Sequence, residues 1–128
     1  MDTNIKFKNK YDLEERTIIF SESVIELCKR IDKNIITIPI INQLLRCGTS
    51  IGANYCEANG ASSKKDFKNK IYICKKEAKE TRYWLKLLKK SISANNELLN
   101  LFDNIFDEAY QLLCIFSKIA FNTKSFSN

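Results

Sequence analysis

The sequence predicts an all-α protein that folds as an antiparallel, up-down-up-down four-helix bundle. The chain of 128 residues contains only three Gly and one Pro, too few for the many turns of an all-β protein. Hydrophobic residues make up 45% of it and charged residues 28%, which is the balance of a folded globular protein. Apolar residues recur at helical spacing in four segments that are separated by three short breaks.

The first two helices follow from the apolar spacing and from their end signals. The first is expected from about Asp12 to Ile31, with Asp12 as its N-cap. Residues 32–38 break the pattern. Pro39 is expected to open the second helix, because an N–H group has no intrahelical partner at that position. Gly60 should end it.

The third and fourth helices have clearer N-terminal signals. Ser63 precedes the third helix, and Asp66 stands three residues later, as in an approximate capping box. This helix should reach about Lys90 and be the longest of the four. Asn95 can cap the fourth helix, which should end near residue 121.

These segments predict a single domain, residues 1–128, with a core of about 12–121 and tails at 1–11 and 122–128. Ten residues on the apolar stripes are expected to be buried. They are Leu44, Ile51, Phe67, Ile71, Cys74, Leu85, Leu88, Phe102, Leu113 and Phe116.

Gly48 and Gly52 lie four residues apart on the apolar face of the second helix. The segment around them lacks the Gly-Lys-Ser/Thr of a phosphate-binding loop. Each Gly costs a helix about 1 kcal/mol relative to Ala, which close packing must offset. The pair therefore predicts that a neighbouring helix approaches here.

The reactive residue types argue against an enzyme. The chain has no histidine, which excludes histidine-based triads and the Glu-x-x-His di-iron site of some bundles. Its five cysteines are scattered and should be small, buried, apolar residues without disulfides. Glu57, Glu77 and Glu80 could in principle perform acid–base chemistry, but no nucleophile or ligand set accompanies them. We expect no catalytic residue, no cofactor and no metal.

The N-terminus has no apolar run typical of a signal peptide, and no stretch approaches the roughly 18 apolar residues of a membrane span. We therefore expect a cytoplasmic protein that does not interact with a membrane.

Positive charge is concentrated on the third helix. Residues 64–90 contain eleven Lys or Arg and three Asp or Glu, a net charge of +8, whereas the rest of the chain has ten against twelve, a net charge of −2. At about 100° per residue, most of these cations fall within an arc of roughly 140°. Such a face attracts phosphate backbones, anionic membrane surfaces or an acidic protein. A solvated lysine face is the alternative, although such faces usually alternate charges. The candidate nucleic-acid contacts, named here the basic ridge, are Lys65, Lys68, Lys75, Lys79, Arg82 and Lys86.

A second set of polar residues lies on the flanks of the apolar stripes of the second and third helices. In a monomeric bundle Trp84 should be buried and the charges should be in water. The pattern instead favours a subunit interface fixed by Arg–carboxylate pairs. The candidate interface residues are Arg46, Glu57, Glu77, Glu80 and Trp84.

Two motifs resemble a known family. One is Gln-Leu-Leu-Arg-Cys-Gly-Thr-Ser-Ile-Gly-Ala-Asn at 43–54, followed by Glu57-Ala58. The other is Ser-Lys-Lys-Asp-Phe at 63–67, followed by Lys-Glu-Ala-Lys-Glu-Thr-Arg-Tyr-Trp-Leu at 76–85. They are similar to the four-helix-bundle proteins named after intervening sequences of bacterial 23S ribosomal RNA genes, over roughly residues 11–120. Cys47 stands where the family usually has Ser.

The resemblance implies an antiparallel bundle that assembles as a homopentamer. The same fold serves as the accessory protein of diversity-generating retroelements, which binds nucleic acid and a reverse transcriptase. The resemblance brings no catalytic residues with it. The expected function is that of a non-catalytic, oligomeric bundle that binds RNA or other nucleic acid through the basic ridge. The alternative is a protein-interaction or scaffold subunit, such as an accessory partner of a reverse transcriptase.

Overall fold

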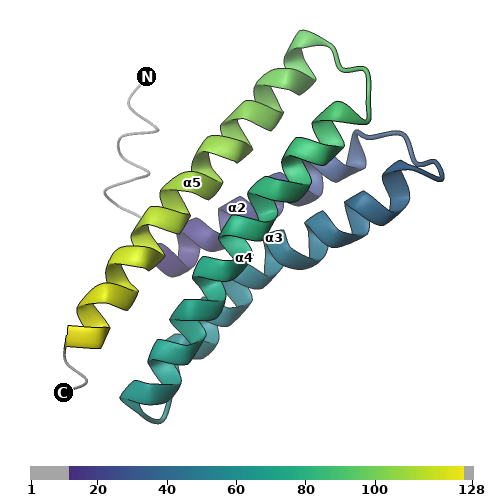
Figure 1. The fold of residues 1–128 in the computed structure, drawn as a ribbon. Coiled ribbons are helices and arrows are strands. Elements are labelled where there is room, and N and C mark those ends of the chain that lie inside the picture. Colours follow the sequence, from purple (N-terminus) through teal and green to yellow (C-terminus); the bar gives the residue numbers. More distant parts are fainter. Residues whose placement is uncertain (1–11, 126–128) are drawn as a thin grey trace.

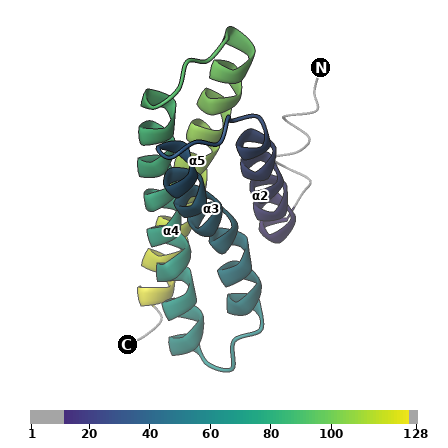
Figure 2. The ribbon, with the colours of Figure 1, turned by 90° about the vertical axis from the view of Figure 1, so that its right-hand side faces the viewer.

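The computed structural model describes residues 12–125, and this range forms four α-helices and no strand (Figure 1). The helices are α2 (Leu13–Lys29), α3 (Thr37–Asn59), α4 (Lys64–Lys90) and α5 (Asn96–Ser125). Successive helices run antiparallel and pack on one another, and α5 also contacts α2 to close the bundle. Figure 2 shows α2 and α4 on opposite sides of the bundle. The predicted fold class is confirmed.

Local capping chemistry sets three of the helix starts. The carboxylate of Asp12 accepts a hydrogen bond from the N–H of Glu15 at 2.8 Å. The hydroxyl of Ser63 accepts from the N–H of Asp66 at 3.0 Å. The side-chain oxygen of Asn95 accepts from the N–H of Leu98 at 2.8 Å. Each cap satisfies an N–H group that has no partner within its helix. All three predicted caps are confirmed.

The start of α3 was predicted wrongly at Pro39, because the helix begins two residues earlier, at Thr37. The Asn34 side-chain oxygen accepts hydrogen bonds from the N–H groups of Ile36 and Thr37, both at 2.9 Å. Asn34 thus satisfies the first donors of the helix, and Pro39 falls within the first turn, where its missing N–H needs no partner. Gly60 ends α3 as expected.

The prediction that the third helix is longest is also wrong. The fourth helix, α5, has 30 residues and α4 has 27. The α5 helix continues past the expected end at residue 121, to Ser125, and in this last part the hydroxyl of Thr123 donates a hydrogen bond to the carbonyl of Ile119. Residues 122–125 are therefore helical rather than part of a tail. The other predicted tail, 1–11, lies outside the described residues.

Eight of the ten residues predicted to form the core are buried. The exceptions are Phe67 and Leu113, which are half-buried and pack against the edge of the core. Phe67 lies in the first turn of α4, at the end of the bundle. Leu113 is displaced outward because its neighbour Leu112 takes the inward position and is fully buried.

The close approach predicted at the two glycines is confirmed. A Cβ placed on Gly48 would lie 3.0 Å from a methyl carbon of Val24 on α2. A Cβ placed on Gly52 would lie 2.9 Å from the hydroxyl oxygen of Thr17. These glycines therefore let α2 pack directly on the backbone of α3.

The cysteines divide into two classes, and all five are free. Cys28, Cys47 and Cys74 are buried as expected, whereas the expectation is wrong for Cys56 and Cys114, which are exposed. Both exposed residues lie on the outer side of their helices, since Tyr55 and Phe116 take the neighbouring inward positions and their rings meet at 5.5 Å.

Candidate nucleic-acid interface

Five lysines of the basic ridge lie on the surface of α4 without a compensating carboxylate. Lys65, Lys79 and Lys86 are exposed, and Lys68 and Lys75 are half-buried. None of the five forms an ion pair with any residue in the described part of the chain. Their charges are therefore available to an external anion.

Other lysines of the same helix are compensated within the chain. Lys70 pairs with Glu57 at 2.7 Å, and Lys89 pairs with Asp103 at 3.0 Å. The hydrogen bond to Glu57, together with its charge, raises the pKa of Lys70. The bundle thus supplies carboxylates at the flanks of the ridge and leaves its centre positive.

Arg82 differs from the lysines of the ridge, because it does not simply point outward as predicted. Its guanidinium carbon lies 3.9 Å from the ring centre of Phe106 and 4.9 Å from that of Tyr110, both on α5. Its Nε donates a hydrogen bond to the carbonyl oxygen of Phe106 at 3.4 Å. Arg82 therefore lies over α5 in cation–π contact and extends the positive surface across the seam between α4 and α5.

Sequence reasoning missed the two aromatic residues under Arg82. Neither Phe106 nor Tyr110 is among the candidate residues predicted from the sequence, although they stand four residues apart on the same helical face. That spacing is the signal that could have identified them. Which helix their face meets depends on the packing of α5, so the contact with Arg82 was not predictable from spacing alone.

Three of the five candidate interface residues, Arg46, Glu77 and Glu80, meet one another within a single chain, whereas Glu57 pairs with Lys70. Arg46 Nη1 lies 3.3 Å from both carboxylate oxygens of Glu77, and its Nη2 lies 2.8 Å from Glu80 Oε2. Glu77 is buried, with a side chain only 8% exposed, while Arg46 is 46% exposed. The polar flanks that the sequence predicts on the second and third helices thus face each other where α3 packs on α4. Their role between subunits stays a prediction.

Trp84 continues this flank on α4, four residues after Glu80. Its side chain is half-buried, and its indole Nε1 is buried without a hydrogen-bond partner in the described part of the chain. The neighbouring Tyr83 is 55% exposed and meets the indole edge-on at 5.0 Å. The surface next to the Arg46 pairs is therefore aromatic, and the indole N–H beneath it has no acceptor among the described residues.

Among residues 12–125, no three Cys, Asp or Glu side chains gather as a metal site requires. No helix in the same range has the length and apolar character needed to cross a bilayer.

Two comparisons place this chain among known proteins. The family model described as "23S rRNA-intervening sequence protein" matches residues 9–114. A solved structure from Bacteroides thetaiotaomicron, a protein of unknown function from the S23 ribosomal protein family, is similar at 31% sequence identity and a TM-score of 0.73. The similarity covers 85% of this chain and 98% of that one. No curated protein matches the chain.

Proposed function

The chain belongs to the 23S rRNA-intervening sequence protein family, and we propose that it is a non-catalytic, oligomeric protein that binds RNA or DNA through the basic ridge of α4. One observation carries the proposal: five ridge lysines share one side of a helix and have no carboxylate partner among the described residues.

The dimensions of the ridge suit a phosphate backbone. Lys65 and Lys86 are separated by 21 helical steps, or about 32 Å at 1.5 Å per residue. Duplex DNA carries one negative charge for about every 1.7 Å of its axis, so several phosphates can lie within reach of the ridge. Binding to phosphates releases condensed counterions, and it requires no recognition of bases.

The surface around Trp84 supports the oligomeric part of the proposal. Tyr83 is exposed and the Trp84 side chain is half-buried, so their rings form an aromatic surface beside the Arg46 pairs. A second subunit that covers this surface removes it from water. We propose a homopentamer as the form of this assembly, because the family resemblance implies one. Repeated ridges on one assembly would raise avidity for a long strand that reaches several of them.

The proposal is tested by fluorescence anisotropy with a labelled 20-nucleotide RNA and a labelled 20-base-pair DNA at about 50 mM salt, where electrostatic binding is strong. Lys79→Glu should weaken binding of both. Lys29→Glu is the matched control, because it changes the net charge of the protein by the same amount. Lys29 is also exposed, and it lies on α2, across the bundle from α4 (Figure 2). Lys75→Glu combined with Lys79→Glu should reduce affinity by about tenfold or more.

Absence of binding by the unmodified protein under these conditions would refute the nucleic-acid function. The ridge would then be a docking face for an acidic protein, as in the alternative of a scaffold subunit, or a plain solvated surface. A pull-down with the unmodified protein and with the Lys75→Glu, Lys79→Glu variant distinguishes these two.

A further inference from the structure

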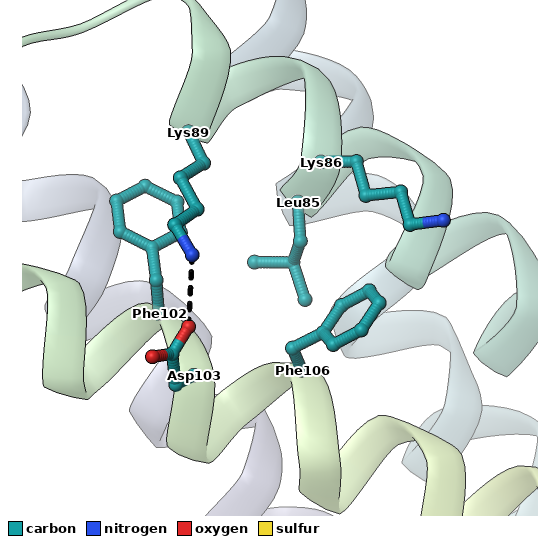
Figure 3. Close-up of a pocket in the computed structure, with 6 residues that line it drawn as sticks. All are labelled: Leu85, Lys86, Lys89, Phe102, Asp103 and Phe106. Atoms are coloured by element: carbon teal, nitrogen blue, oxygen red, sulfur yellow. Dashed lines mark hydrogen bonds and ion pairs between the residues drawn. The ribbon is translucent and has the colours of Figure 1, made fainter.

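A small pocket opens between α4 and α5 at one end of the basic ridge. Leu85 projects from α4 between Phe102 and Phe106 of α5, and Lys86 and Lys89 stand on either side of it (Figure 3). The pocket has a volume of about 200 Å³. Phe102 is buried and forms the floor, whereas Phe106 is half-buried and forms a wall.

The size and lining of the pocket restrict its occupant. Pockets for drug-sized ligands and cofactors measure roughly 300–1,000 Å³, so this pocket holds one ring system rather than a whole cofactor. Its interior is apolar and aromatic, which favours a flat ring. Its rim is cationic, which favours a negative charge attached to that ring.

The charges around the rim are not equivalent. Lys89 is already paired with Asp103 at 3.0 Å, which closes one side of the pocket (Figure 3). The ammonium of Lys86 has no carboxylate partner in the described range and lies 5.8 Å from the ring centre of Phe106. Arg82, stacked on the same ring, uses only its Nε in a hydrogen bond that the structure shows. Arg82 does not line the pocket itself, but it rests on the Phe106 ring that does, four residues before Lys86, so cationic donors lie next to the Phe106 wall.

We propose that this pocket receives the base of an unpaired nucleotide, while Lys86 and Arg82 hold the adjoining phosphate. The inference rests on the proposed nucleic-acid function and adds a distinction between two forms of nucleic acid. The pocket contributes to the binding of single strands and not to the binding of duplexes. In a duplex the bases are stacked inside the helix and cannot enter the pocket. Stacking on an aromatic wall tolerates any base, so no sequence preference is required.

The test compares Phe106→Leu with the unmodified protein on three labelled DNA probes: a 12-nucleotide thymidine strand, the same strand with abasic sites throughout, and a 20-base-pair duplex. Phe106→Leu should weaken binding of the thymidine strand by about 5- to 100-fold, the range expected from losing one stacked base. Binding of the abasic strand and of the duplex should change less than about twofold, because the phosphate contacts remain. Tyr72→Leu is the control, since Tyr72 is an exposed aromatic residue of α4 outside the pocket.

A second measurement uses only the unmodified protein, so its result does not depend on whether a variant folds. A single strand containing 5-iodouracil should crosslink under ultraviolet light to the pocket residues of the unmodified protein, with Phe106 and its neighbours identified by mass spectrometry. Crosslinks confined to other parts of the chain would overturn the inference. So would equal weakening of the thymidine and abasic strands by Phe106→Leu, or an equal effect of Tyr72→Leu.

These results separate the two proposals. If the unmodified protein binds all three probes but the pocket variant shows no selective effect, the pocket inference is wrong and the proposed function stands. If the unmodified protein binds none of these DNA probes and does not bind the 20-nucleotide RNA at about 50 mM salt, both are wrong.

Discussion

Gly52 on α3 lies so close to Thr17 on α2 that a methyl group added at residue 52 would come within 2.9 Å of the Thr17 hydroxyl oxygen. Thr17 is fully buried, and its hydroxyl donates a hydrogen bond to the carbonyl of Glu14 at 2.7 Å. The hydroxyl therefore cannot move aside without losing a buried hydrogen bond. This contact determines how closely the first two helices pack.

We predict that Gly52→Ala lowers the free energy of unfolding by about 1–2 kcal/mol. The gain in helix propensity, about 1 kcal/mol, is outweighed by overpacking, which typically costs 1–3 kcal/mol and should lie at the upper end here because Thr17 is held in place. Urea denaturation measures the change. Gly60→Ala is the control, because a Cβ there meets only the carbonyl of Glu57 at an ordinary 3.8 Å. Equal stability of Gly52→Ala and the unmodified protein would show that α2 can shift freely.

Arg16 and Glu108 should stabilise the contact between α2 and α5. They form a bidentate ion pair, in which Arg16 Nε lies 2.7 Å from Glu108 Oε2 and Arg16 Nη2 lies 3.0 Å from Glu108 Oε1. The Arg16 side chain is only 10% exposed and that of Glu108 is 23% exposed. The hydrogen bond to Glu108 raises the pKa of Arg16. A guanidinium stays protonated in proteins even without such a partner, so the charge of Arg16 persists when Glu108 is removed. Glu108→Ala should therefore destabilise the protein by about 2–4 kcal/mol, since it leaves a largely buried cation unpaired.

The matched control for that pair is the exposed pair of Arg30 and Glu26, spaced four residues apart on α2. Glu26→Ala should cost only about 0.3–0.5 kcal/mol, because water screens both charges. Thermal unfolding by circular dichroism compares the two variants. Similar melting temperatures for both would contradict a special role for the Arg16–Glu108 pair.

Salt should weaken nucleic-acid binding with a slope that reports how many ridge lysines are engaged. If all five lysines of one ridge contact phosphates, the logarithm of the association constant should fall against the logarithm of salt concentration with a slope of about −4.5 for duplex DNA and −3.5 for single strands. Replacing Lys75 and Lys79 by Gln should make the duplex slope less steep by about 1.8. An unchanged slope would mean that these two lysines do not contact phosphates.

Assembly should depend on Arg46 more than on Lys75. Arg46→Ala leaves the buried carboxylate of Glu77 without its cation, whereas Lys75 has no carboxylate partner in the described chain. Sedimentation equilibrium should show a larger loss of oligomer for Arg46→Ala than for Lys75→Ala. Trp84→Ala, which removes the aromatic ring from the proposed contact surface, should also weaken assembly. Light scattering that gives a monomer for the unmodified protein at micromolar concentration would contradict the proposed oligomer.

Thiol labelling should separate the cysteines into two classes. Burial raises the pKa of the Cys28 thiol to about 11 and that of Cys74 to about 12, against an ordinary value near 9. At pH 8 only about 0.1% of Cys28 would be thiolate, the reactive form. Cys56 and Cys114 should react with Ellman's reagent in the folded protein, and Cys28, Cys47 and Cys74 only after unfolding. Cys56→Ser and Cys114→Ser should each remove one accessible thiol from the titration.

The raised thiol pKa values also predict a loss of stability in alkali. The folded state keeps the buried thiols protonated at pH values where the unfolded chain releases their protons. The contribution of Cys28 and Cys74 is complete below about pH 9 and decreases as the pH rises toward 11 and 12. Replacing both by Ala should flatten the fall in unfolding free energy between pH 9 and 11, relative to the unmodified protein.

Much of this protein is determined by short stretches of its sequence, because helix formation and capping act over a few residues. Asp12, Ser63 and Asn95 cap helices through hydrogen bonds to residues three positions away. The apolar spacing identified four helices and most of the core, and the pair Gly48 and Gly52 indicated a close helix contact. The family motifs at 43–54 and 76–85 fall on α3 and α4, and they indicated the family to which the chain belongs.

Only the tertiary structure decided which side chains meet. The sequence placed Arg46 and Glu77 on the flanks of two helices, but their pairing depends on the register of α3 against α4. Arg82 was expected to point outward with the lysines, and it lies instead on Phe106, because the rotation of α5 presents that ring to α4. Cys56 and Cys114 fit a helical pattern as well as Cys74 does, yet they lie outside the core. Spacing along a helix defines a face, whereas the packing of four helices against one another determines what each face touches.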